Sequence, residues 1–437
     1  MSRYRQFITY ANYTAFLALL CAMPYPMPFI RFFGLVWIIS WLLEVRFLQR
    51  PNTSRSNIFV AAGFTVWFVW NLISVAWAHN TAAAWSCIQR DLYILAIPLV
   101  MLWGVNERYN WQQIVKVMFI SSLVSVFVYL FTHFWLMNSA AAWDRLTPRN
   151  YSIDWLHPDD FLHGIKHRLH YTSFLTLTIA AGLLQFTSTI QTSSNHSNFF
   201  KPFKHIAPYA IGTVVLIAAC IWTGSRAALV NIGLLIALTS LYIWTNAPLL
   251  KGLPPRPKWQ RITAAAVVAA LILAAFLLML RFHPRQLGLS IHEQFTVHED
   301  NQYAPTIEPR IAIWHTALET PQDYSLHGLG VGNSTDYIIN KYIDHNYSYY
   351  LSSHYSVHNQ FLATWMELGL LAAILWLLFW LALPLVFTGQ QRFWVALACA
   401  ICFVALATDL FLAGVEGIAF TIIVFTLLAV LQQKKHP

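Results

Sequence analysis

Long apolar runs separated by short polar segments form the dominant pattern along this chain. Each run is about 20 residues long, the length that an α-helix needs to cross a hydrocarbon core of ~30 Å. We therefore expect an all-α, polytopic integral membrane protein with about twelve transmembrane helices. The expected spans cover residues 7–23, 29–47, 58–77, 84–103, 114–137, 169–186, 206–222, 227–244, 262–280, 361–383, 393–412 and 418–431.

Two longer polar segments interrupt this pattern. The larger one, residues 282–357, lies between the ninth and tenth expected spans, and the smaller one covers residues 140–168. The chain is thus expected to divide into membrane helices 1–9 over residues 1–281, an outer loop with short helices over residues 282–357, and membrane helices 10–12 over residues 358–437.

The composition agrees with a membrane protein. Hydrophobic residues make up 57% of the chain and charged residues only 10%, which is too apolar for an ordinary soluble domain. All five cysteines lie inside apolar runs, so no disulfide framework is expected. The net charge of +9 does not indicate nucleic-acid binding, because the lysines and arginines are spread over short loops.

The loop charges predict an orientation. Lysine and arginine gather in alternate loops, whereas the short loops 24–28, 78–83 and 411–415 contain neither residue. By the positive-inside rule both termini are cytoplasmic, and segments 140–168 and 282–357 lie outside. If the outer side is a bacterial periplasm, ATP and nucleotide sugars are absent there. A reaction on that face needs a substrate that arrives activated, such as a lipid-linked diphosphate sugar.

Several basic residues near the outer side are candidate anion ligands. Arg226 occupies a four-residue gap between two spans, where an arginine is costly unless it meets an anion or a polar cavity. Its planar guanidinium suits phosphate oxygens, although it also suits snorkelling to the interface. Arg90 lies beside Asp91 within the fourth span, so it either binds substrate or is simply neutralised by Asp91.

The smaller polar segment ends in a basic group. Arg168 follows Arg145, Arg149 and Lys166, and His170 and Tyr171 then open the sixth span. An excess of positive charge outside the membrane is explained by an anionic ligand, or by contact with lipid headgroups.

The outer loop carries further candidates. Arg310 begins the stretch 310–314, either an amphipathic helix on the membrane surface or a short helix packed within the loop. The glycines of 328–332 follow no strand, so they predict a tight turn with close backbone approach and not a nucleotide site. The histidines of the loop show no metal-ligand spacing, and no metal is expected.

His358 closes the outer loop at the mouth of the tenth span, directly before Asn359. A neutral imidazole can take the proton of a sugar hydroxyl as its oxygen attacks an anomeric carbon. A helix cap or an interfacial residue is the alternative role for a histidine at this position.

Taken in order, several of these motifs resemble the O-antigen ligase family, which shares its membrane domain with O-antigen polymerases and some protein O-oligosaccharyltransferases. Each motif alone is weak, but their order, the size of the outer loop and the span count cover nearly the whole chain. The motifs are TGSRAA at 223–228, RIAIW at 310–314, the glycine turn 328–332, HNQFL at 358–362 and the sequence Glu367-Leu368-Gly369.

The resemblance implies an enzyme without cofactors. It would move a polysaccharide from undecaprenyl diphosphate to a sugar hydroxyl of lipid A–core, on the periplasmic face of the bacterial inner membrane, without metal and with inversion. The family's essential arginine and histidine correspond to Arg226 and His358, the latter as general base. The remaining implied residues are Arg310, Arg90, Arg168, His170 and Tyr171 for the donor diphosphate, and Asn359, Asp409 and Glu416 as support.

Three other functions remain open. An O-antigen polymerase uses the same donor with a second lipid-linked glycan as acceptor, and a protein O-oligosaccharyltransferase uses a peptide acceptor. A single long outer loop before a His-Asn helix favours the ligase, because polymerases more often divide their outer polar mass between two loops. A transporter of lipid-linked glycan would line its path with Arg90 and Arg226, but its halves should repeat, and the two halves here share neither loop lengths nor charged positions.

Overall fold

The computed structural model describes residues 3–137, 168–193, 200–223, 225–246, 309–324, 326–345 and 356–433. Within these residues the chain forms α-helices and short 3-10 helices and no strand, as the sequence predicts. The expected ninth span and most of the segment 140–168 lie outside the described residues, and so does a large part of the outer loop.

The first half of the chain contains helices of very different lengths. Their bounds are α1 Arg3–Ala22, α2 Met27–Leu43, η1 Arg46–Leu48, α3 Arg55–Ser74, η2 Val75–Trp77, α4 Thr81–Asp91, η3 Leu92–Leu95, α5 Ala96–Trp103, α6 Trp111–Met137, α9 Arg168–Ser193, α10 Phe200–Trp222 and α11 Arg226–Asn246.

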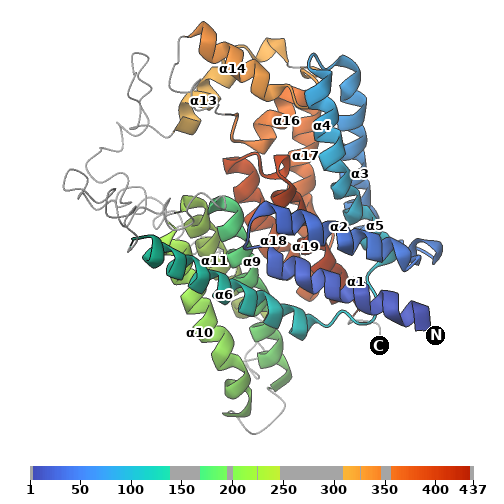
Figure 1. Ribbon diagram of the computed structural model, residues 1–437, viewed down its shortest axis with the longest axis vertical. Coiled ribbons are helices and arrows are strands. Elements are labelled where there is room, and N and C mark those ends of the chain that lie inside the picture. Colours follow the sequence, from blue (N-terminus) through green and yellow to red (C-terminus); the bar gives the residue numbers. More distant parts are fainter. Residues whose placement is uncertain are drawn as a thin grey trace.

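The second half adds the outer helices and the last membrane helices. Their bounds are α13 Pro309–Leu318, η9 Pro321–Asp323, α14 Ser334–Asp344, α16 Gln360–Leu368, α17 Leu370–Ala382, η10 Leu383–Leu385, α18 Gly389–Thr408, η11 Phe411–Ala413 and α19 Val415–Gln433. In Figure 1, α13 and α14 lie at one end of the molecule, next to α16 and α4.

Six of the described helical segments are long and apolar enough to cross a membrane: Met27–Leu48, Arg55–Trp77, Thr81–Trp103, Trp111–Thr132, Gly389–Thr408 and Val415–Gln433. Three shorter apolar helices are Pro208–Trp222, Ala227–Tyr242 and Leu370–Leu385. The expected spans at 7–23 and 169–186 fall in α1 and α9, which belong to neither group and carry several polar side chains. The fold is that of a helical membrane protein, and the total of twelve spans stays a prediction.

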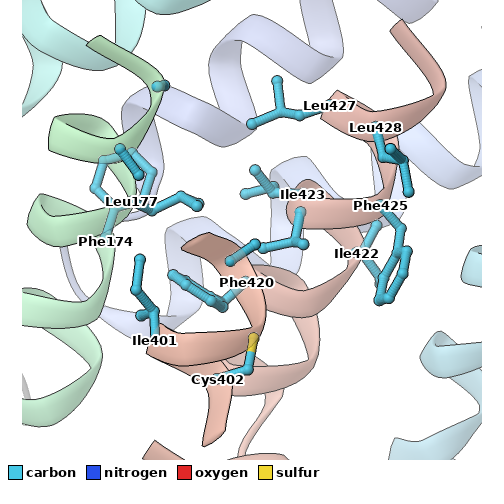
Figure 2. Packing of buried hydrophobic residues seen from close by; sticks show 14 of the residues in the cluster. Phe174, Leu177, Ile401, Cys402, Phe420, Ile422, Ile423, Phe425, Leu427 and Leu428 are labelled. Atoms are coloured by element: carbon cyan, nitrogen blue, oxygen red, sulfur yellow. The ribbon is translucent and has the colours of Figure 1, made fainter. Parts of the chain in front are cut away.

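Helix α19 forms the centre of the bundle. Its apolar window is 89% buried inside the protein, whereas that of Met27–Leu48 is only 22% buried. A helix that is apolar on all sides is stable when surrounded by other helices, and one with exposed apolar residues suits contact with lipid. Figure 2 shows α19 packed against α9 and α18 through Phe420, Ile423, Phe174 and Ile401. Cys402 also lies in this core, as its position in an apolar run predicts.

The expected tenth span is broken near its outer end. Gly369 separates α16 from α17 and has a φ of +88°, which L side chains rarely adopt. A Cβ at this position would lie 2.1 Å from the carbonyl oxygen of Leu326, so the outer loop approaches the break closely. The short α16 therefore stands apart from the apolar α17, and it carries His358 and Asn359 at its beginning.

The glycine turn fastens the outer loop to the membrane helices. Leu329 and Gly330 donate their backbone N–H groups to the carbonyls of Met366 and Glu367, at 2.8 and 2.9 Å. A Cβ on Gly330, whose φ is +87°, would lie 2.6 Å from the Cα of Ala78. This confirms the predicted close backbone approach.

Candidate active site

The turn between α18 and α19, residues 408–416, is the point where most candidate side chains meet. It is contacted from α4, α9, α13 and the beginning of α16, which are far apart in the sequence. Several of the described side chains contact this turn. Arg310 bonds to Thr408, and His358 bonds to Asp409. His170 contacts Phe411 and Glu416, Gln360 bonds to Leu412, and Arg90 bonds to Ala413. We call residues 408–416 the outer turn.

His358 and Asp409 form a hydrogen-bonded pair at the outer turn. The Nδ1 atom of His358 lies 3.0 Å from Oδ1 of Asp409, and their side chains are 24% and 12% exposed. The same carboxylate oxygen accepts the N–H of Leu410 at 2.8 Å. A carboxylate on Nδ1 fixes the orientation and tautomer of an imidazole, so that Nε2 can accept a proton.

The backbone at His358 is held in an unusual conformation. Its φ is +48°, in the left-handed region where a side chain other than that of glycine is strained. Such strain is found preferentially at functional sites, where the surrounding structure maintains it. Asn359 follows as the N-cap of α16 and accepts the N–H of Leu362 at 3.0 Å. Asn359 therefore caps the helix that directly follows His358.

Arg310 lies beside this pair. Arg310 is the second residue of α13. Its Nε donates to the carbonyl of Thr408 at 2.9 Å, and Thr408 directly precedes Asp409. Trp314, one turn further along, donates its indole N–H to the carbonyl of Val357 at 3.0 Å. One helix thus holds both chain segments that carry the histidine and the carboxylate.

Helix α13 is packed within the outer loop. Ile313 and Ala317 are fully buried against residues of α14 and α16, so of the two interpretations of the stretch 310–314 the structure shows the packed helix.

Tyr337 of α14 donates a hydrogen bond to Asp323 at 2.6 Å. Burial and the neighbouring Asp323 carboxylate together raise the pKa of Tyr337 to about 12, so the phenol keeps its proton.

His170 approaches the outer turn from α9. Its ring stacks on Phe411 with centroids 5.1 Å apart, and its Nε2 lies 3.9 Å from Oε2 of Glu416. Tyr171 points elsewhere, since its hydroxyl lies 3.2 Å from Ser125 and its ring packs on Tyr129 in a fully buried position. His170 is therefore placed at the candidate site, and Tyr171 belongs to the packing of α9 against α6.

Arg90 forms an ion pair with Asp91 and also bonds to the outer turn. The Nε of Arg90 lies 3.1 Å from Asp91, and its Nη1 donates to the carbonyl of Ala413 at 2.8 Å. The side chain of Asp91 is 1% exposed, so the pair satisfies a buried carboxylate and holds the outer turn at the same time.

Two expected arginines have side chains outside the described part of the structure. The backbone shows that α9 begins at Arg168 and α11 at Arg226. Ser225, directly before α11, accepts the N–H of Ala228 and receives a hydrogen bond from Thr172 of α9 at 3.3 Å. The N-terminal end of α11 therefore lies next to the end of α9 that carries His170.

Asp409 and Glu416 were predicted only as supporting residues, and the central position of the outer turn was not predicted. Neither was the role of Gln360, whose buried side chain accepts the N–H of Leu412 at 3.1 Å. A signal for this position was present in the sequence, because two carboxylates flank a short loop that contains no lysine or arginine. A carboxylate at each end of such a loop requires partners from other segments.

An apolar groove leads away from the site. Its volume is about 350 Å³, and one end is formed by Asn359 and Phe361, next to His358. The other end is formed by Leu370, Ile374 and Leu377 of α17, of which Ile374 is 44% exposed. The groove thus lies between the beginning of α16 and an apolar helix, and His358 is not among its lining residues.

Fold and site together define a helical membrane protein with a histidine–carboxylate pair and arginines at one end of its helices. Residues 211–377 match the family model described as O-antigen ligase, and this stretch includes α11, the outer loop and His358. The match covers 167 of the 437 residues, less than half of the chain, and it supports the resemblance seen in the motifs. Members of this family are glycosyltransferase-like ligases and polymerases. A search of curated proteins finds no match for the chain.

Proposed function

We propose that the protein is an O-antigen ligase. It transfers a polysaccharide from undecaprenyl diphosphate to a sugar hydroxyl of lipid A–core, on the periplasmic face of the inner membrane. The observation that carries this proposal is the hydrogen-bonded pair of His358 and Asp409, 3.0 Å apart at the outer turn. Arg310 bonds to Thr408, the residue that precedes Asp409. The family match over residues 211–377 supports the same class of reaction.

His358 acts as the general base. With its Nδ1 hydrogen-bonded to Asp409, its Nε2 takes the proton of the acceptor hydroxyl. The acceptor oxygen then forms a bond to the anomeric carbon while the bond from that carbon to the phosphate oxygen breaks. The bonding electrons leave with undecaprenyl diphosphate, and a single displacement inverts the anomeric centre. Asp409 stabilises the imidazolium that forms, as an adjacent carboxylate does in other histidine-based sites.

Arginines bind the donor diphosphate in this proposal. Arg226, at the N-terminus of α11, and Arg310 offer charge to an anion that becomes more negative as it leaves. The N-terminal end of α11 adds the positive end of a helix dipole. Arg168, Arg90 and His170 complete the expected set. Of these, Arg90 mainly positions the outer turn through Ala413, and Tyr171 acts through the packing of α9.

The donor's polyprenyl chain lies in the apolar groove. A groove of about 350 Å³ holds only part of one polyprenyl chain and is too small for the several acyl chains of lipid A. It is lined by Asn359, which follows His358 in the sequence, and by residues of α17, so in this proposal a chain lying in it reaches the surface of an apolar helix. The reaction needs no metal or cofactor in this proposal, because diphosphate is a good leaving group.

The orientation follows from the positive-inside rule. We place both termini in the cytoplasm and the loop 282–357 in the periplasm, between membrane helices 1–9 and 10–12. In support, the end of α19 lies beside the N-terminal part of the chain, since Gln433 bonds to the carbonyl of Val105 and Asn106 to that of Thr9.

Reconstitution of the purified chain tests the function. Lipid-linked glycan and lipid A–core are supplied in vesicles without ATP or added metal, and the product is the ladder of ligated lipopolysaccharide. The His358→Ala and Arg226→Ala variants should each abolish the ladder while remaining in the membrane. His315→Ala, at an exposed histidine of α13, is the matched control and should keep the ladder.

The other functions give different products in the same assay. A polymerase would lengthen the lipid-linked glycan without lipid A–core, and a protein O-oligosaccharyltransferase would need a peptide acceptor. A transporter would move the donor across the vesicle membrane and form no product. Normal ligation by His358→Ala would overturn the proposed role of the imidazole.

A further inference from the structure

A second cavity, of about 340 Å³, lies between the beginning of α1, the end of α2 and the turn 104–110. It is far from the candidate active site. The end of α19 contacts Val105 through Gln433, whereas Glu416 at its beginning lies near His170. The 19 residues of α19 span about 28 Å at 1.5 Å per residue, so the two cavities lie at opposite ends of the bundle.

Side chains of both charges line this cavity. Arg5 and Arg46 contribute positive charge, and Glu44 and Glu107 contribute carboxylates. Asn106 donates its amide N–H to the Glu44 carboxylate at 2.5 Å, and Arg46 donates through Nε to the carbonyl of Trp103 at 3.3 Å. The charged groups are therefore held by three separate segments of the chain.

The surface around the cavity is apolar. Leu43 of α2 lines the cavity and is 47% exposed, and Ile39 and Phe7 nearby on α2 and α1 are exposed as well. These exposed residues belong to, or lie next to, the segment Met27–Leu48, which is apolar enough to cross a membrane. The cavity thus opens at the end of a membrane-crossing segment, at the level where lipid headgroups lie.

The backbone beside the cavity is strained. Val45, which also lines it, has a φ of +55°, and a β-branched residue is a clear outlier in this region. The strained turn directs Glu44 and Arg46, its two neighbours, to the same cavity. Backbone strain of this kind accumulates where a ligand is bound.

We infer that this cavity binds the headgroup of a zwitterionic aminophospholipid, with Arg5 and Arg46 on its phosphate and Glu44 and Glu107 on its primary ammonium. Arginine suits phosphate oxygens, and a primary ammonium donates three hydrogen bonds that carboxylates accept. The acyl chains lie on the exposed apolar side chains of α2. An anionic headgroup without an ammonium would bring a second negative charge next to the two carboxylates, with no positive charge of its own to offset it.

Lipid binding to the purified full-length chain tests this inference. The delipidated protein in detergent is titrated with dioleoyl phosphatidylethanolamine, phosphatidylglycerol or phosphatidylcholine, and bound lipid is counted by native mass spectrometry. We expect phosphatidylethanolamine to bind most tightly, and Glu44→Gln and Arg46→Gln each to weaken it by about tenfold, as loss of one charge-assisted hydrogen bond implies. Glu44→Gln keeps an oxygen for Asn106, and unfolding temperatures identify any variant that has lost its fold.

Arg50→Gln is the matched control, because Arg50 is exposed at the same end of the protein and does not line the cavity. It should bind phosphatidylethanolamine like the wild type. Equal binding of the three lipids, tighter binding of phosphatidylglycerol, or equal loss in Arg50→Gln would each overturn the inference. Ligase activity is measured separately on the same samples, so failure here does not bear on the proposed function.

Discussion

Replacing Asp409 by asparagine tests the proposed base most directly. The substitution keeps the size of the side chain and an oxygen that can accept the N–H of Leu410, but it removes the charge beside His358. If the carboxylate stabilises the imidazolium formed during transfer, turnover should fall while binding of the donor changes little.

The expected size follows from the geometry. The hydrogen-bonded atoms are 3.0 Å apart. Two unit charges with centres about 4 Å apart interact by about 4 kcal/mol at an effective dielectric of about 20. The side chains of His358 and Asp409 are 24% and 12% exposed, so solvent screens part of this interaction. We take about 2 kcal/mol as the remaining effect, which corresponds to a fall of about 30-fold in kcat.

The assay is initial-rate ligation in the reconstituted system, with donor and acceptor varied separately to divide the effect between kcat and KM. Asp409→Glu should recover part of the rate, because it restores the charge. Asp336→Asn, at an exposed carboxylate that bonds Asn80, controls for loss of an outer negative charge. A kcat for Asp409→Asn within twofold of the wild type, in a folded protein, would refute the reasoning.

Further substitutions test the groove, the outer loop and the core. Ile374→Trp should fill the groove and raise the KM for the donor with little change in kcat, whereas unchanged donor kinetics would place the polyprenyl chain elsewhere. Gly330→Ala should destabilise the protein by about 3 kcal/mol in denaturant unfolding, because its Cβ would meet the backbone of Ala78, and an unchanged midpoint would contradict this. Asn359→Ala should cost about 1 kcal/mol through loss of the α16 cap, and Asn359→Ser should restore most of it. Asn231→Leu should raise the unfolding temperature, because both polar atoms of this buried amide lack a hydrogen-bond partner among the described residues; a lower temperature would show that the amide is needed.

Much of the fold was predictable because a membrane simplifies the problem. A backbone inside lipid must satisfy its own hydrogen bonds, so apolar runs of sufficient length predict helices. The predicted spans correspond to described helices except for 262–280, which lies outside the described residues. The break at Gly369 was not predicted, although a glycine that adopts a positive φ after the last helical residue is a local signal for a helix end.

The candidate site was likewise predicted only in part. His358, Arg310, Asp409 and Glu416 were predicted as site residues, and the structure brings them to one turn. The motifs could not distinguish Arg90 from the other arginines, although its bonds to Asp91 and Ala413 give it a positioning role. His170 and Tyr171 are adjacent in the sequence, yet only His170 contacts the outer turn.

The sequence by itself determined the helical membrane fold, the family resemblance and the residue types available for chemistry, because hydropathy and motif order are local properties. Only the tertiary structure decided which of those residues act together. His358 and Asp409 are 51 positions apart, and Arg310 is 98 positions from the Thr408 carbonyl to which it bonds. Their meeting depends on how α13, α16 and α18 pack, and helix packing is set by many distant contacts that no single segment encodes.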